Sequence, residues 1–278
     1  TTRNHQHTQF FPIGTTRAAA LAMAHGMGMP VAHTPAPTPV SNGWKYILSP
    51  TNPLQRVLSG PNYAEPFSGS GILFFENNYG GAVRQTVILG LTARGHCEDF
   101  GGKIDAVKLP ANANTLKLNA AKEALEESQL LFAVENTDPE RTVNGINYYV
   151  DVDDNANRSM YRCYFMAVNT GTEDLPAMFM NNKRSMPTGV QNTQEFLETI
   201  SLHRFDLPNI EAALRATATG GINVQDVMGT NLRIGTRTAK CLRHFINDPA
   251  LRFVVLNNPI IANQRNHANY ANVRQYAS

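Results

Sequence analysis

The stretch Gly101-Gly-Lys-Ile-Asp105, followed by Asn119-Ala-Ala-Lys-Glu-Ala-Leu-Glu-Glu-Ser128, carries the strongest chemical pattern in the chain. Its glutamates, Glu123, Glu126 and Glu127, stand at positions i, i+3 and i+4, so on a helix they share one face. Neighbouring carboxylates repel one another, and Mg²⁺, which prefers oxygen ligands and often bridges carboxylates to phosphates, relieves that repulsion. The spacing is compatible with a metal site, although a solvated acidic face is the commoner origin of such a pattern.

The same segment predicts a helix from about Thr115 to Leu131. Leu118, Ala121 and Leu125 fall on the face opposite the glutamates, and we expect that face to pack against a sheet.

Strands and helices are predicted to mix along the rest of the chain, which indicates an α/β or α+β fold. Segments rich in β-branched and aromatic residues predict strands at 71–75, 85–92, 146–150, 160–168 and 199–205. Residues 151–157 are predicted to be a loop. Helices are predicted from Pro208 to Arg215 and from Thr236 to Asn247.

The glycine pair and the glutamates together resemble the signature of the Nudix hydrolase family, G-x5-E-x7-R-E-U-x-E-E-x-G-U, in which U is bulky and apolar. Gly101-Gly-Lys-Ile-Asp105 looks like the glycine opening, and Ala120-Ala-Lys-Glu-Ala-Leu-Glu-Glu127 looks like the glutamate end. The resemblance implies a Nudix-like α/β/α sandwich with a mixed sheet. It also implies that Glu123, Glu126 and Glu127 bind metal, with the backbone carbonyl of Gly101 as a further ligand.

The sequence departs from the family pattern at several positions. The family arginine is Lys122, which keeps the charge but loses the two-pronged guanidinium. The position of the late glycine is Gln129, so we expect the turn after the helix to be altered. Six additional residues separate Gly102 from Lys122, and counting back from Lys122 places Asn114 where the family has its middle glutamate.

The resemblance extends to a strand and helix at residues 196–211. In the family, a glutamate just before this strand often completes the metal site or acts as the base. Glu198 is the closest match and Glu195 is its rival, while a polar loop residue is an equal interpretation of Glu198. The implied catalytic residues are therefore Glu126 and Glu198, and Glu198 is also an implied metal ligand.

The activity implied by the resemblance is hydrolysis of a nucleoside diphosphate-linked substrate with Mg²⁺ or Mn²⁺. The expected partner is a nucleoside diphosphate-type small molecule or capped RNA. Candidate base-gripping aromatics are Tyr148, Tyr149, Tyr161 and Phe165, although aromatic residues on strands more often pack into a core. Arg233, Arg237, Lys240 and Arg243 form a basic stretch that can contact phosphates or form a solvated helix face.

The composition suits a folded protein of low charge. Apolar residues make up 42% and charged residues 17% of the chain, and the net charge of +2 excludes a strongly basic nucleic-acid coat. Cys97, Cys163 and Cys241 are odd in number and form no CxxC, which excludes a disulfide scaffold and favours a reducing, intracellular compartment. No apolar run is long enough to span a membrane.

Three regions are expected along the chain: an N-terminal arm and linker at residues 1–43, a Nudix-like domain at 44–261 and a polar C-terminal tail at 262–278. The first acidic residue is Glu65, so the start of the chain has the composition of an organelle targeting segment or of an arm that packs on a partner. The arm and the departures from the family pattern motivate an alternative function, in which a catalytically inactive Nudix-fold protein is a structural or binding subunit of an assembly.

Overall fold

The computed structural model describes residues 43–77, 79, 84–132, 148–154, 158–168, 170, 173–186 and 194–257. These residues all belong to one compact unit, which spans residues 41–278. The expected arm at 1–43, except for Gly43, and the expected tail at 262–278 lie outside them.

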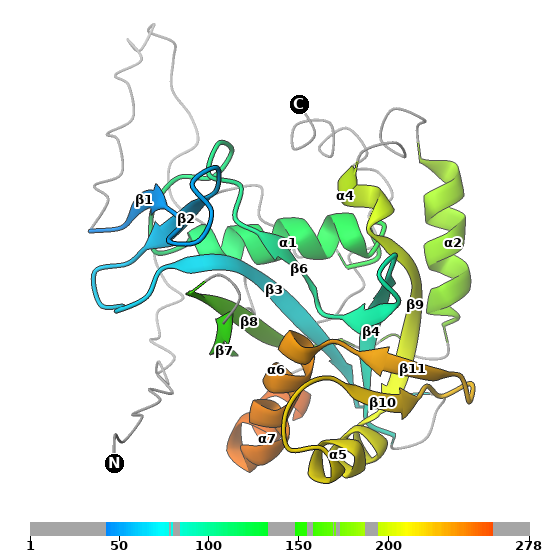
Figure 1. Ribbon diagram of the computed structural model, residues 1–278. Coiled ribbons are helices and arrows are strands. Elements are labelled where there is room, and N and C mark those ends of the chain that lie inside the picture. Colours follow the sequence, from blue (N-terminus) through cyan, green and yellow to red (C-terminus); the bar gives the residue numbers. More distant parts are fainter. Residues whose placement is uncertain are drawn as a thin grey trace, which may run out of the picture. The chain divides into compact units, whose positions relative to one another are not determined.

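The described part of the chain contains eleven strands and six helices (Figure 1). The strands are β1 (Lys45–Leu48), β2 (Arg56–Ser59), β3 (Phe67–Glu76), β4 (Thr86–Thr92), β5 (His96–Glu98), β6 (Phe100–Lys103), β7 (Tyr148–Asp154), β8 (Ser159–Val168), β9 (Thr199–Asp206), β10 (Ile222–Gln225) and β11 (Asn231–Ile234). The helices are α1 (Thr115–Glu127), α2 (Leu175–Ser185), α4 (Gln194–Leu197), α5 (Leu207–Ala216), α6 (Thr236–Asn247) and α7 (Pro249–Asn257).

The strands form one mixed, open sheet, which confirms the predicted mixture of α and β structure. β3 lies at its centre: it pairs in parallel with β8 and antiparallel with β2, β4 and β6. β4 pairs antiparallel along its whole length with β9, and β5 pairs in parallel with β11. Parallel pairing at the centre requires both faces of the sheet to be covered.

Helices cover both faces of the sheet and close a core on each. Successive side chains of β3 and β8 enter these two cores alternately. Leu73 and Phe75 join the core under α5, α6 and α7, whereas Ile72 and Phe74 join the core under α1 and α2. This alternation is the two-residue period of a strand whose two faces are both buried. All ten residues of β3 are buried, and its second half contains the continuous apolar run Ile72–Phe75.

Helix α1 packs through a different face from the one we predicted. Its contact with the sheet is made by Leu116, one amide and small side chains that include the predicted Ala121. The glutamates are buried too, whereas Leu118 and Leu125 are only half-buried. Asn119 Nδ2 donates to Ser70 Oγ at 3.2 Å and to the Gly102 carbonyl at 3.3 Å. The expected opposition of an apolar and an acidic face is therefore wrong, because Glu123 and Glu127 are directed towards β6 instead of solvent.

The predicted strands are confirmed, with different ends. β7 continues to Asp154 through half of the predicted loop at 151–157, because Asp151 pairs with Arg162 across the hairpin at 2.7 Å. Residues 155–157 lie outside the described residues. The first predicted turn of α5 does contain Pro208, and all three cysteines are buried and free.

Candidate functional site

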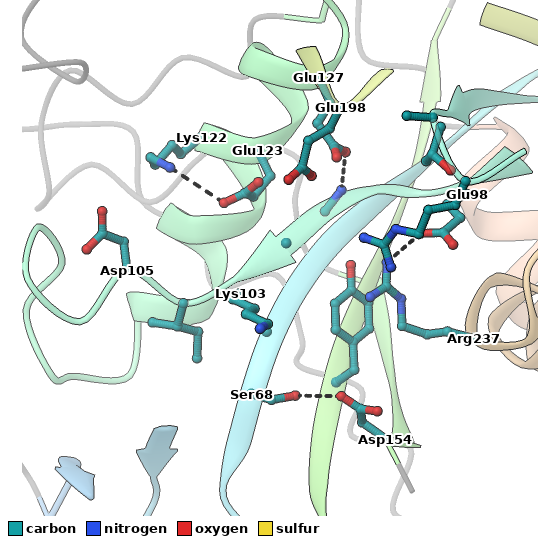
Figure 2. A pocket seen from close by; sticks show the side chains of 18 of the residues that line it. Ser68, Glu98, Lys103, Asp105, Lys122, Glu123, Glu127, Asp154, Glu198 and Arg237 are labelled. Atoms are coloured by element: carbon teal, nitrogen blue, oxygen red, sulfur yellow. Dashed lines mark hydrogen bonds and ion pairs between the residues drawn. The ribbon is translucent and has the colours of Figure 1, made fainter. Parts of the chain in front are cut away.

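Residues from three separate segments line one cleft of about 910 Å³, which we call the glutamate cleft. Gly101 and Gly102 of β6, Glu123 and Glu127 of α1, and Glu198 before β9 all line it. Figure 2 shows Glu123, Glu127 and Glu198 beside one another above strand β6. The tertiary structure thus brings together four of the five predicted ligand positions.

Glu127 is held by the backbone of the glycine pair. Its Oε2 accepts a 2.7 Å hydrogen bond from the amide of Gly101, and β6 pairs only with β3 among the described strands. The bond satisfies an amide at a sheet edge that lacks a strand partner. Since the amide and carbonyl of one residue in an antiparallel ladder point to the same side, the Gly101 carbonyl also points towards α1.

The second glycine makes room for Glu123. A Cβ on Gly102 would lie 2.5 Å from Glu123 Oε2 and 2.7 Å from Glu123 Cδ, so only glycine leaves space for the carboxylate. At Gly101 a Cβ would meet the Gly71 Cα at 2.5 Å, in the neighbouring strand. The first glycine therefore permits strand pairing and the second permits burial of the glutamate.

Glu126 is oriented differently from its two neighbours. Its carboxylate accepts a 3.0 Å hydrogen bond from Lys122 Nζ, and Glu126 is not among the residues that line the glutamate cleft. Lys122 Nζ also lies 3.5 Å from Glu123 Oε1. The lysine therefore compensates two of the three carboxylates.

Glu198 is brought to the cleft by a well-anchored segment. Gln129 Nε2 donates to the Phe196 carbonyl at 2.8 Å, and the Ala93 amide donates to the Glu198 carbonyl at 3.2 Å. Lys183 of α2 donates to the Thr199 carbonyl at 3.0 Å. Three other segments thus fix the backbone at Glu198, while nothing is described of the side chain of its rival, Glu195.

The turn after α1 keeps the geometry that a glycine normally provides, so the expected alteration is wrong. Gln129 has a φ of 52°, its amide donates to the Glu126 carbonyl at 3.1 Å, and the Leu130 amide donates to the Leu125 carbonyl at 2.9 Å. These two bonds define a Schellman motif, whose left-handed residue is usually glycine. A glutamine takes that position here, and its side chain reaches Phe196.

The additional residues between β6 and α1 leave the cleft open. No described residue from 106 to 114 lines it, and Asn114, the positional match of the middle glutamate, also lies outside it. The Asp105 side chain accepts hydrogen bonds from the amides of Val107 and Lys108, and the Tyr46 hydroxyl of β1 donates one to the Leu109 carbonyl at 3.1 Å. These bonds hold the loop on the side of β1.

A buried aspartate supports the opposite wall. Asp99 Oδ2 accepts a 2.5 Å bond from the Tyr161 hydroxyl, and Asp99 Oδ1 accepts a 2.7 Å bond from Thr238. Arg237 of α6 lies over the Tyr161 ring and lines the cleft. Asp99 and Arg237 have no counterpart in the glutamate motif, and the only sequence signal was the basic stretch that begins at Arg233.

The predicted base-gripping aromatics do not gather at the cleft. Tyr161 alone among them lines it, with its ring buried beneath Arg237. Phe165 belongs to the core under α7, Tyr148 packs against that core, and Tyr149 packs on Tyr164. These residues are structural, as aromatic residues on strands commonly are.

The buried carboxylates have raised pKa values. Burial, and the nearby charges of Glu126 and Glu198, raise the pKa of Glu123 to about 7 against the lowering effect of Lys122. Burial, followed by the charges of Glu123 and Asp99, holds the pKa of Glu127 well above its usual range. Two protonatable carboxyls therefore face one cleft, which is a recurrent property of functional sites.

The carboxylates line the cleft without forming a ready metal cage. Among the described residues, no group of three or more His, Cys, Asp or Glu side chains is already arranged to hold a metal ion. Glu127 is bonded to Gly101 and Glu123 is close to Lys122, so metal coordination requires rotation of these side chains.

A serine–histidine–aspartate chain lies outside the glutamate cleft. Ser201 Oγ is 2.9 Å from His203 Nε2, and His203 Nδ1 is 2.8 Å from Asp226 Oδ2. Asp226 also accepts hydrogen bonds from the amides of Met228 and Thr230 in the β10–β11 turn. These contacts connect β9 to the β10–β11 turn.

The chain matches no family model, and no curated protein is significantly similar to it. No helix in the described part of the chain is long and apolar enough to cross a membrane.

Proposed function

We propose that the protein is a metal-dependent hydrolase of nucleoside diphosphate-linked substrates, with a Nudix-like α/β/α sandwich. The observation that carries the proposal is the meeting of Gly101, Glu123, Glu127 and Glu198 in one open cleft. If the glutamates of α1 formed a solvated acidic face, Glu123 and Glu127 would be exposed, whereas both are buried against the glycine pair. The proposal also rests on the two sheet faces being covered by helices.

The donor set suits Mg²⁺ or Mn²⁺, which prefer carboxylate and carbonyl oxygens. Burial is the main cause of the raised pKa values of Glu123 and Glu127, and a divalent cation favours their ionised forms. Glu123, Glu127 and the Gly101 carbonyl are the proposed ligands. When bound, the cation would neutralise charge on the diphosphate and lower the pKa of a bound water.

The protein groups supply orientation and the base. The Gly101 amide positions Glu127, Lys122 positions Glu123, and Glu198 faces the same space from a fixed backbone. Glu198 is the proposed base, which accepts the proton of the attacking water. Glu126, which pairs with Lys122 outside the cleft lining, is left out of the proposed catalytic set.

The test is phosphate release from a panel of nucleotide sugars, dinucleoside polyphosphates, nucleoside triphosphates and capped RNA with Mg²⁺ or Mn²⁺. Glu127→Gln keeps the size and the hydrogen-bond acceptor for Gly101 but removes the charge. We expect metal-dependent turnover that this variant loses by at least about 100-fold. Glu211→Gln, at a position on α5 outside the cleft, is the matched control.

A second candidate is an inactive Nudix-fold subunit that binds a partner in an assembly. The favouring observation is that Lys122 already compensates Glu123 and Glu126, in a cleft without a preformed metal cage. The proposed contact, the arm at residues 1–43, lies outside the described residues except for Gly43. Absence of turnover on the whole panel, in folded protein that also fails to bind Mn²⁺, would favour this function.

A further inference from the structure

Arg237 is a positively charged side chain that faces the glutamate cleft from outside the glutamate motif. It is the second residue of α6, and its guanidinium carbon lies 4.0 Å from the centre of the Tyr161 ring. In Figure 2, Arg237 lies on the other side of β6 from Glu123 and Glu127. The side chain is 31% exposed, so the ring supports the guanidinium while leaving it open to the cleft.

The fold uses the hydrogen-bonding capacity of Arg237 only in part. Arg237 Nη2 lies 3.4 Å from Asp99 Oδ1 and 3.6 Å from Glu98 Oε2. Charge-assisted bonds between these groups are normally about 2.7–2.9 Å long. Arg237 Nε is buried and has no acceptor among the described residues. Asp99, in contrast, already has short bonds from Tyr161 and Thr238, so it does not depend on the arginine.

Two further cations border the same space. Lys103 of β6 and Arg94 of the β4–β5 turn line the glutamate cleft, are exposed, and form no ion pair with a described residue. The cleft therefore combines buried carboxylates with free positive charge. An arginine fork matches two oxygens of one phosphoryl group, a geometry that a lysine cannot reproduce.

We propose that Arg237 binds the diphosphate group of the substrate, with Lys103 and Arg94 adding favourable charge. This assignment rests on the proposed function: the glutamates serve the metal on one side of β6, and Arg237 takes the anion on the other. It gives a role to the segment β10–β11–α6, which carries the arginine to the cleft.

Binding of inorganic pyrophosphate, measured by calorimetry in EDTA, tests the assignment without metal or turnover. We expect Arg237→Met to weaken binding at least tenfold and Arg237→Lys at least threefold. Lys240→Met is the matched control, because Lys240 lies on the same helix, bonds to the Asp153 carbonyl and does not line the cleft. We expect this control to bind within twofold of the unmodified protein.

The assignment is overturned if the unmodified protein does not bind pyrophosphate, or if the folded Arg237 variants bind it as tightly as the unmodified protein. Thermal unfolding checks folding, and Arg237→Lys alone decides the question if the methionine variant does not fold. Arginine-dependent binding without hydrolysis of any substrate would reject the hydrolase while supporting the anion site. Hydrolysis of a substrate, with pyrophosphate binding unchanged in the Arg237 variants, would support the hydrolase and reject the anion site.

Discussion

The amide of Gly101 donates a 2.7 Å hydrogen bond to Glu127 Oε2, so the glycine pair and the glutamate helix form one structural unit. The two residues are far apart in the sequence. β6 has no strand on its outer side among the described residues, and the carboxylate takes the place of one. The bond orients Glu127 before any ligand arrives, which is the preorganisation that a functional site requires.

Gly102→Ala tests whether the second glycine reserves space for Glu123. The new Cβ meets only the flexible end of that side chain, so the protein should fold while the carboxylate is displaced. We expect a roughly 10- to 100-fold loss of Mn²⁺ affinity, measured by calorimetry. Gly101→Ala is the contrast, because its Cβ meets the backbone of β3 and should lower the melting temperature. Unchanged metal affinity in Gly102→Ala would contradict the assigned role of Glu123.

Gln129 occupies a left-handed position that costs a side chain about 1 kcal/mol relative to glycine. Gln129→Ala and Gln129→Gly both remove the bond to Phe196, but only glycine relieves the backbone. The glycine variant should therefore be more stable than the alanine variant by about 1 kcal/mol in urea unfolding. Equal stabilities would show that the turn does not keep its left-handed geometry in solution.

The stability of the metal-free protein should fall as the pH rises. The pKa of Glu123 is raised to about 7 by burial, so between pH 4.5 and 7 the folded state binds more protons than the unfolded state. Stability is then lost as the pH rises through the folded pKa, by about 2 kcal/mol between pH 5.5 and 8.0 for this group. Urea unfolding in EDTA measures the difference.

Glu123→Gln is the control for this pH dependence, since it removes one titrating carboxyl and should reduce the slope. Adding Mg²⁺ at pH 8.0 should restore stability to the unmodified protein and not to the variant. A slope that is the same in both proteins would mean that Glu123 is ionised in the folded state at low pH.

Lys122→Met should destabilise the protein by about 3 kcal/mol at pH 8.0, because it leaves buried carboxylates without a nearby cation. Lys122 Nζ lies 3.0 Å from Glu126 and 3.5 Å from Glu123, and its side chain is only 9% exposed. Lys122→Arg keeps the positive charge and should cost less than about 1 kcal/mol. Chemical denaturation compares the two variants, and equal losses would indicate a packing role for residue 122.

Local patterns were sufficient to predict the elements around the site. The i, i+3, i+4 spacing located the glutamate helix, and β-branched runs located β3, β4, β8 and β9, because each pattern depends on residues close together in the chain. The close contacts that a Cβ would make at Gly101 and Gly102 explain why both positions are glycine. The short strands β1, β2, β10 and β11 lacked such signals, since their pairing partners stabilise them.

Long-range contacts decided which residues face the cleft. Spacing alone makes Glu126 equivalent to its neighbours, yet a lysine one turn earlier draws it away. Gln129 adopts the left-handed conformation that glycine usually takes in this turn, because its side chain forms a hydrogen bond to the carbonyl of Phe196, which is distant in sequence. Arg237 reaches the cleft because α6 packs beside Asp99 and Tyr161. Sequence periodicity specifies the face of an element, whereas the packing of elements against one another specifies what that face meets.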